Sequence, residues 1–110
     1  MAMAGFDTAA WDALAIAAGV PLATLLGARP RPIPAYNSCG LGLMADKGAL
    51  AEEAGRLLAG GFRAVKLRLG YPTLAEDIAA TGAVREAIGD DAKLMVDYNQ
   101  ALTLNEALER

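Results

Sequence analysis

Helical spacing of apolar residues marks the first part of the chain. The pair Asp7-Thr8 is suited to cap a helix that runs from Ala9 to a stop at Gly19. Residues 21–27 begin with proline and end with glycine, which is the asymmetry typical of a short helix. We therefore predict a helical segment over residues 1–28.

Three prolines, Pro30, Pro32 and Pro34, alternate with other residues after this segment. Proline has no backbone N–H to donate to a sheet, so the stretch predicts a linker or the entry to a strand, not a central strand. It is the only plausible domain boundary in the sequence, and we assign residues 32–110 to a second unit.

In this second unit, short β-type runs alternate with amphipathic helical runs. Asp46, Thr73 and Thr103 are placed as helix caps, and Glu76 completes a capping box with Thr73. The expected strands are residues 33–38, 62–69 and 93–98, and the expected helices are residues 47–59, 74–88 and 103–110. Such alternation is typical of βαβ units in an α/β fold with a parallel sheet. The pattern alone leaves a doubly wound sheet and a barrel equally open.

Composition narrows the class of protein. The chain has 110 residues, 55% of them apolar. Its net charge is −3 and its charged residues are scattered without a basic stripe, so we expect no nucleic-acid partner. No apolar run approaches the ~18 residues that a membrane span needs, and the start lacks the basic residues of a signal peptide. A single cysteine rules out an internal disulfide. We expect a cytoplasmic protein that does not bind membranes.

Polar side chains gather at the expected strand ends. Lys66 and Arg68 share one face of the second strand, and Asp97 and Asn99 share one face of the third. Parallel α/β folds bind ligands at the carboxyl ends of their strands. One interpretation is an anion-and-metal site, with Asp97 as an oxygen ligand for Mg²⁺. The alternative, an ion-pair cluster with no ligand, fits the spacing equally well.

Two further polar residues, Tyr36 and Ser38, share one face at the end of the first expected strand. Taken alone, they are best interpreted as turn and core residues. Histidine is absent from the chain, which excludes histidine zinc sites and a histidine base within it.

Several segments, taken in order, resemble the mandelate racemase and muconate lactonizing enzyme family of the enolase superfamily, and mandelate racemase in particular. The resemblance covers nearly the whole chain. Its strongest pieces are AGFDTAAWDAL from residue 4, PLATLLG from residue 21, GFRAVKLRLGYP from residue 61, VREAIGDD from residue 84 and MVDYNQ from residue 95. The resemblance implies the first three strands of a (β/α)₈ barrel, preceded by a helical segment that joins it to a capping domain.

The resemblance also implies roles for individual residues. Lys66 and Arg68 match the family's catalytic Lys-x-Lys motif, and Asp97 matches its first metal ligand. Asn99, Ser38 and Tyr36 match positions that contact the substrate. The implied reaction abstracts the proton α to a carboxylate, with Mg²⁺ and a nearby ammonium stabilising the enolate-like intermediate.

Two departures from the family pattern shape the expected function. Arg68 replaces a lysine that acts as a base, and arginine stays protonated, which favours dehydration of an acid sugar or hydroxy acid over racemisation. The family's remaining metal ligands and its His–Asp dyad have no counterpart in the chain. We therefore expect the 110-residue chain to be inactive alone and a homo-oligomer to form. The alternative is a catalytically silent fragment or self-associating structural module.

Overall fold

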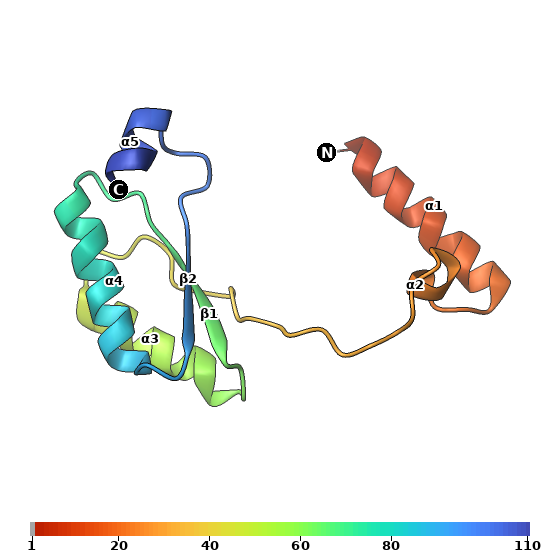
Figure 1. The fold of residues 1–110 in the computed structure, drawn as a ribbon, viewed down its shortest axis with the longest axis horizontal. Helices are drawn as coiled ribbons and strands as arrows, with labels where there is room; N and C mark the ends of the chain where they lie inside the picture. Colours follow the sequence, from red (N-terminus) through yellow and green to blue (C-terminus); the bar gives the residue numbers. More distant parts are fainter. Residues whose placement is uncertain (1) are drawn as a thin grey trace. The chain divides into compact units, whose positions relative to one another are not determined.

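The computed structural model describes residues 2–110, which divide after Pro34 into two compact units (Figure 1). The first unit contains helix α1 (Ala2–Ala18) and the single turn α2 (Leu22–Leu25). The second contains α3 (Lys47–Ala59), β1 (Ala64–Arg68), α4 (Leu74–Ile88), β2 (Lys93–Asp97) and α5 (Leu104–Glu109). Within residues 2–110, no helix is both long and apolar enough to cross a membrane.

Helix α1 starts earlier than we predicted. Thr8 lies inside the helix, and its hydroxyl donates to the carbonyl of Ala4 at 2.8 Å, so it bonds back into the preceding turn instead of capping. The predicted stop is confirmed: Gly19 has φ of 67°, a left-handed conformation that glycine adopts without a Cβ clash. The Gly19 N–H then donates to the carbonyl of Ile16 at 3.0 Å.

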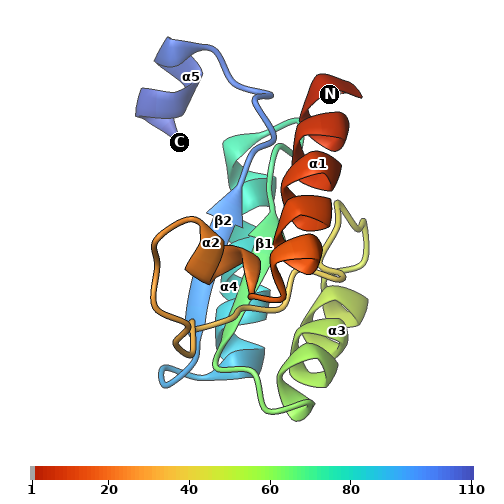
Figure 2. The same ribbon diagram turned by 90° about the vertical axis from the view of Figure 1, so that its right-hand side faces the viewer.

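The second unit is an α/β fold built on two parallel strands. Residues pair from Ala64 with Lys93 to Arg68 with Asp97, and α4 makes the crossover between the strands (Figure 2). The predicted βαβ unit over residues 64–97 is therefore confirmed. Each strand is shorter than we predicted, because ladder pairing covers only these five residues of each.

The predicted strand over residues 33–38 is wrong. Only Asn37 pairs with β1, through its N–H to Ala64 at 2.9 Å and its carbonyl to Lys66 N–H at 3.0 Å. The alternating prolines explain this, since Pro32 and Pro34 cannot donate to a ladder. This single bridge is parallel, and it places the residue 37 segment beside β1, which in turn pairs with β2.

The caps predicted at Asp46, Thr73 and Thr103 are confirmed, whereas the cap predicted at Asp7-Thr8 is wrong because Thr8 lies inside α1. The Asp46 carboxylate accepts N–H groups from Gly48 and Ala49 at 2.8 and 3.2 Å. Thr73 and Glu76 form the expected capping box at the start of α4. Thr103 caps α5 in the same way. These local bonds fix where each helix begins, and hence the length of the loop that follows each strand end.

The Thr73 cap allows a direct stability test. Thr73→Ala removes the hydroxyl that accepts the Glu76 N–H, and we expect the free energy of unfolding to fall by about 1 kcal/mol. Thr73→Ser keeps the hydroxyl and should stay close to the wild type. Urea unfolding monitored by circular dichroism measures both variants. An equal loss for alanine and serine would show that the cap is not the source of the effect.

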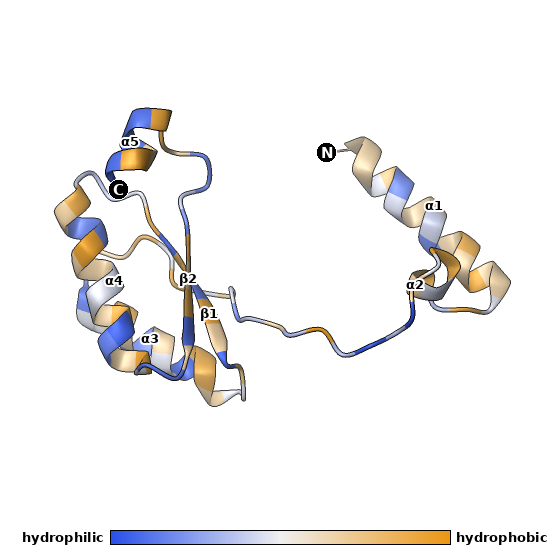
Figure 3. Ribbon diagram, in the orientation of Figure 1, coloured by the Kyte–Doolittle hydropathy of each residue, from blue (hydrophilic) through white to orange (hydrophobic). Residues whose placement is uncertain are grey.

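Helices α3 and α4 pack side by side on one face of the sheet (Figures 1 and 2). Apolar and polar residues alternate along both helices (Figure 3). The fully buried residues of this layer are Leu41, Leu50, Ala54, Val65, Leu67, Ala80 and Val84. Because Val65 and Leu67 point into this core, the residues between and after them point to the other face of the sheet.

Candidate functional site

Strand β1 presents its two basic side chains away from the helices. Its burial alternates along the strand: Val65 and Leu67 are fully buried, Lys66 is half-buried and Arg68 is exposed. This is the arrangement that the period of two in the sequence predicted. The burial of Val65 and Leu67 therefore determines which face of β1 carries Lys66 and Arg68.

Lys66 and Asp97 meet on this face. The Lys66 Nζ donates to Oδ2 of Asp97 at 2.9 Å, and the two side chains keep 24% and 31% of their exposure. The other carboxylate oxygen, Oδ1, accepts the Asn99 backbone N–H at 2.8 Å. The Asp97 carbonyl accepts the Leu69 N–H at 3.0 Å, so the ends of both strands are bonded to each other beside the pair.

The pair shifts both acid–base equilibria toward the charged forms. The hydrogen bond to Asp97 raises the pKa of Lys66 above its usual 10.5. The Asn99 N–H, together with Lys66, lowers the pKa of Asp97 below its usual 3.8. Lys66 is therefore an ammonium ion and Asp97 a carboxylate at neutral pH.

The other predicted site residues lie at different distances from this pair. The Tyr36 ring centroid is 5.7 Å from Lys66 Nζ, within the range of a cation–π contact. Arg68 pairs with Asp97 in the ladder, and its charge also lowers the pKa of Asp97. Asn99 has φ of 49°, which turns the chain sharply after the strand. Ser38 is exposed, one residue beyond the bridge at Asn37.

The ion pair predicts a measurable change in Lys66. Asp97→Asn removes the negative charge that stabilises the ammonium, so the pKa of Lys66 should fall back toward 10.5. NMR titration of the Lys66 side-chain carbon and nitrogen shifts in metal-free buffer measures this. Asp90→Asn, an acidic residue in the turn after α4, is the control and should leave that pKa unchanged. An unaltered pKa in Asp97→Asn would contradict the pairing.

The donor set fits a metal only in part. Asp97 offers carboxylate oxygens, the type of ligand that Mg²⁺ prefers. Within residues 2–110, however, no three His, Cys, Asp or Glu side chains are grouped to hold a metal ion. Asp97 alone cannot supply the several oxygen ligands of a tight Mg²⁺ site.

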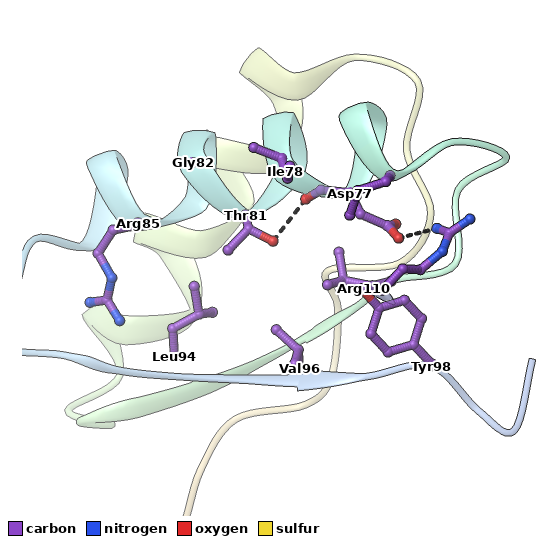
Figure 4. A pocket seen from close by; sticks show the side chains of 11 residues that line it. Asp77, Ile78, Thr81, Gly82, Arg85, Leu94, Val96, Tyr98 and Arg110 are labelled. Atoms are coloured by element: carbon purple, nitrogen blue, oxygen red, sulfur yellow. Dashed lines mark hydrogen bonds and ion pairs between the residues drawn. The ribbon is translucent and has the colours of Figure 1, made fainter. Parts of the chain in front are cut away.

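A cavity of about 590 Å³ lies between α4 and β2, on the face of the sheet that the helices cover and opposite to Lys66 (Figure 4). Its wall is mostly apolar and includes Leu94 and Val96. Asp77 and Arg110 form an ion pair at one end of it. Our reading of the sequence missed Asp77. The signal was present, because Asp77 falls three and seven residues before the buried Ala80 and Val84, on the buried stripe of α4.

Known proteins align with nearly the whole chain. Residues 49–110 match the family described as enolase C-terminal domain-like. The chain is 40% identical over 107 residues to 3,6-anhydro-α-L-galactonate cycloisomerase of Streptomyces coelicolor. This alignment covers 97% of the chain and 29% of that enzyme.

Two solved structures share the fold. L-talarate dehydratase from Polaromonas sp. JS666, complexed with Mg and L-glucarate, superposes with a TM-score of 0.80 at 38% identity, over 94% of this chain and 29% of that one. An enolase from Bradyrhizobium, complexed with magnesium and mandelic acid, superposes with a TM-score of 0.76 at 41% identity, over 96% of this chain and 28% of that one.

The chain therefore spans less than a third of the length of the relatives that it matches. The match extends beyond one motif, because it covers the helices, both strands and the strand-end residues in a single alignment. On this ground the chain belongs to the mandelate racemase and muconate lactonizing enzyme family of the enolase superfamily.

Proposed function

We propose that this chain is the first part of a (β/α)₈ barrel enzyme that abstracts the proton α to a carboxylate with the help of Mg²⁺. The observation that carries the proposal is the Lys66–Asp97 pair at the carboxyl ends of two adjacent parallel strands. Such strand ends are where barrel enzymes place their catalytic residues. The solved relatives with magnesium and mandelic acid or L-glucarate support a carboxylate substrate.

Each residue has a distinct role in this proposal. Asp97 would hold Mg²⁺, which would stabilise the negative charge that develops on the substrate carboxylate. Lys66 stays protonated beside Asp97 and neutralises the same developing charge. Arg68 binds the carboxylate through paired hydrogen bonds. Tyr36, Ser38 and Asn99 contact the remainder of the substrate, a role that the family pattern and their positions around the strand ends support.

The chemical step needs a base that these residues do not provide. When the Cα–H bond breaks, its electron pair delocalises into the carboxylate, and the Lys66 ammonium stabilises the charge that develops there. The proton passes to a base from a later part of the barrel. In a dehydration, the electron pair then forms a Cα–Cβ double bond as the β-hydroxyl leaves, protonated to water by an acid from a later part of the barrel, and the resulting enol tautomerises to a 2-keto-3-deoxy acid. Of the reactions open to this site, we favour dehydration because Arg68 cannot serve as a second base.

Exposed apolar side chains support an incomplete barrel. Val96 on β2 is 50% exposed and Ile78 on α4 is 61% exposed, both beside the cavity. Leu104 and Leu108 on α5 are still more exposed. Further strands and helices of a complete barrel would cover such surfaces. The same surfaces support the second candidate function, a self-associating module. Sedimentation of the 110-residue chain distinguishes them, since a monomer at micromolar concentration would contradict self-association.

The test of the proposed function uses the complete protein that contains this chain. It is incubated with a panel of aldonic and aldaric acids, with Mg²⁺ or with EDTA, and NMR detects 2-keto-3-deoxy products. We expect product only with Mg²⁺ and loss of product in Asp97→Asn. Asp91→Asn, in the turn before β2, is the matched control and should stay active. Failure of every acid to react or to exchange its α-proton would overturn the proposal.

A further inference from the structure

Asp77 is a buried charged side chain in the first turn of α4, at one end of the apolar layer. It is 2% exposed and lies on the same stripe of α4 as the fully buried Ala80 and Val84. Among residues 2–110, it is the one buried residue with a charged side chain. A carboxylate is costly to bury unless each of its oxygens is matched by donors. A buried carboxylate at this position therefore requires hydrogen-bond donors around it.

The partners of Asp77 lie in the loop after β1 and at the end of α5. Oδ1 accepts the backbone N–H groups of Gly70 and Tyr71, both at 3.0 Å. Oδ2 is paired with the Arg110 guanidinium (Figure 4). Arg110 also donates to the carbonyls of Tyr71 and Pro72 at 3.1 and 3.3 Å. The Asp77 carboxylate therefore binds the loop after β1 directly, and it also holds this loop indirectly through Arg110.

This fastened loop is continuous with the candidate site. Gly70 directly follows Leu69, whose N–H donates to the Asp97 carbonyl at 3.0 Å. Gly70 has φ of 117°, a conformation that a residue with a side chain would adopt only under strain. Tyr98, the next residue after Asp97, lines the same cavity as Asp77. Gly70, which the Asp77 carboxylate binds, directly follows Leu69. Tyr98 directly follows Asp97, to which Leu69 is hydrogen-bonded.

The network also reaches the segment before α3. The Tyr71 hydroxyl donates to the Met44 carbonyl at 2.8 Å and accepts the Met44 N–H at 2.8 Å. The Lys47 ammonium lies 3.5 Å from the centroid of the Tyr71 ring. Asp77 therefore fixes Tyr71 at its backbone, while Tyr71 fixes the loop that follows Asn37. Three successive loops at the carboxyl ends of the strands are joined in this way.

We propose that Asp77 is a positioning residue: from the helix-covered side of the sheet, it holds the ends of β1 and β2 in the arrangement that puts Lys66 beside Asp97. The inference rests on the proposed function for its catalytic consequence, but its geometric part does not. Burial alone would raise the pKa of Asp77, yet the N–H groups of Gly70 and Tyr71 and the Arg110 guanidinium outweigh burial and lower it. The residue therefore acts as a carboxylate.

The test compares Asp77→Asn with Val84→Ala in the complete protein. Asparagine keeps an oxygen for the backbone N–H groups but loses the charge that pairs with Arg110. Val84→Ala opens a small cavity in the same helix and touches none of the bonds of Asp77. For Asp77→Asn, we expect kcat to fall about 10- to 100-fold with KM little changed, as for other residues that orient a site indirectly. Val84→Ala should lose stability and keep its kcat.

Hydrogen exchange supplies a second readout that needs no activity. The Leu69 and Asn99 amides are bonded to Asp97, so both should exchange faster in Asp77→Asn and remain protected in Val84→Ala. Arg110→Met tests the same network if Asp77→Asn does not fold. Unchanged exchange and kcat, or equal losses in the control, would overturn the inference. If the wild type has no activity but the exchange pattern appears, the proposed function fails and the positioning role stands.

Discussion

Lys66→Met in the complete protein should lower kcat for proton abstraction by about 10²- to 10³-fold, the effect typical of removing one group that stabilises negative charge in the transition state. The physical reason is that Lys66 is held as an ammonium ion by Asp97 and faces the open side of the sheet. Methionine keeps most of the chain length and removes the charge, so the expected loss is electrostatic.

The matched control for this change is Lys93→Met. Lys93 begins β2, at the end of the strand away from Asp97, and it is exposed. The Lys93→Met variant should keep kcat within about twofold of the wild type, as is usual for surface substitutions distant from a site. Steady-state rates on the best acid of the panel measure both variants. A Lys66→Met enzyme with full activity would remove Lys66 from the mechanism and would leave the ion pair as a structural feature only.

The second large effect concerns Arg68 and the stereochemistry of the reaction. We expect wild-type enzyme in D₂O to exchange the α-proton of one enantiomer of a hydroxy acid and not of the other. The family pattern places the second base at the position of Arg68, and a guanidinium stays protonated in proteins, so it cannot accept the α-proton. The second exchange should therefore be too slow to detect.

Arg68→Lys sharpens this prediction. Lysine retains the positive charge on the open face of β1, but burial or neighbouring cations readily lower its pKa. We therefore expect slow exchange of the second enantiomer to appear in the variant, together with a raised KM from the loss of paired hydrogen bonds. Proton NMR of each enantiomer follows the exchange. Efficient exchange of both enantiomers by the wild type would defeat this account of Arg68.

Local interactions made much of the fold predictable. The Asp46 and Thr73 caps depend on residues within one turn, so the starts of α3 and α4 could be read from the sequence. The face on which Lys66 lies also followed, since Val65 and Leu67 on either side had to be buried. These features need no knowledge of distant segments.

Features that depend on distant partners could not be predicted. The expected strand over residues 33–38 shrank to a bridge at Asn37, because extended residues become a strand only when a neighbouring chain can bond them. The place of Asp77 on the buried stripe of α4 was visible in the sequence, but its ion pair was not, because its partner Arg110 lies at the other end of the unit. The contact between Lys66 and Asp97 was easier to predict, because parallel strands bring their carboxyl ends to the same edge of the sheet.

The most direct test of the central claim is a crystal structure of the complete protein with Mg²⁺ and an unreactive carboxylate analogue of the substrate. The account predicts Mg²⁺ bound to the Asp97 carboxylate, with Lys66 Nζ within hydrogen-bonding distance of the analogue and the Arg68 guanidinium on the open face of β1 beside it. Mg²⁺ bound elsewhere, with Asp97 still paired only to Lys66 and the analogue absent from the strand ends, would contradict it.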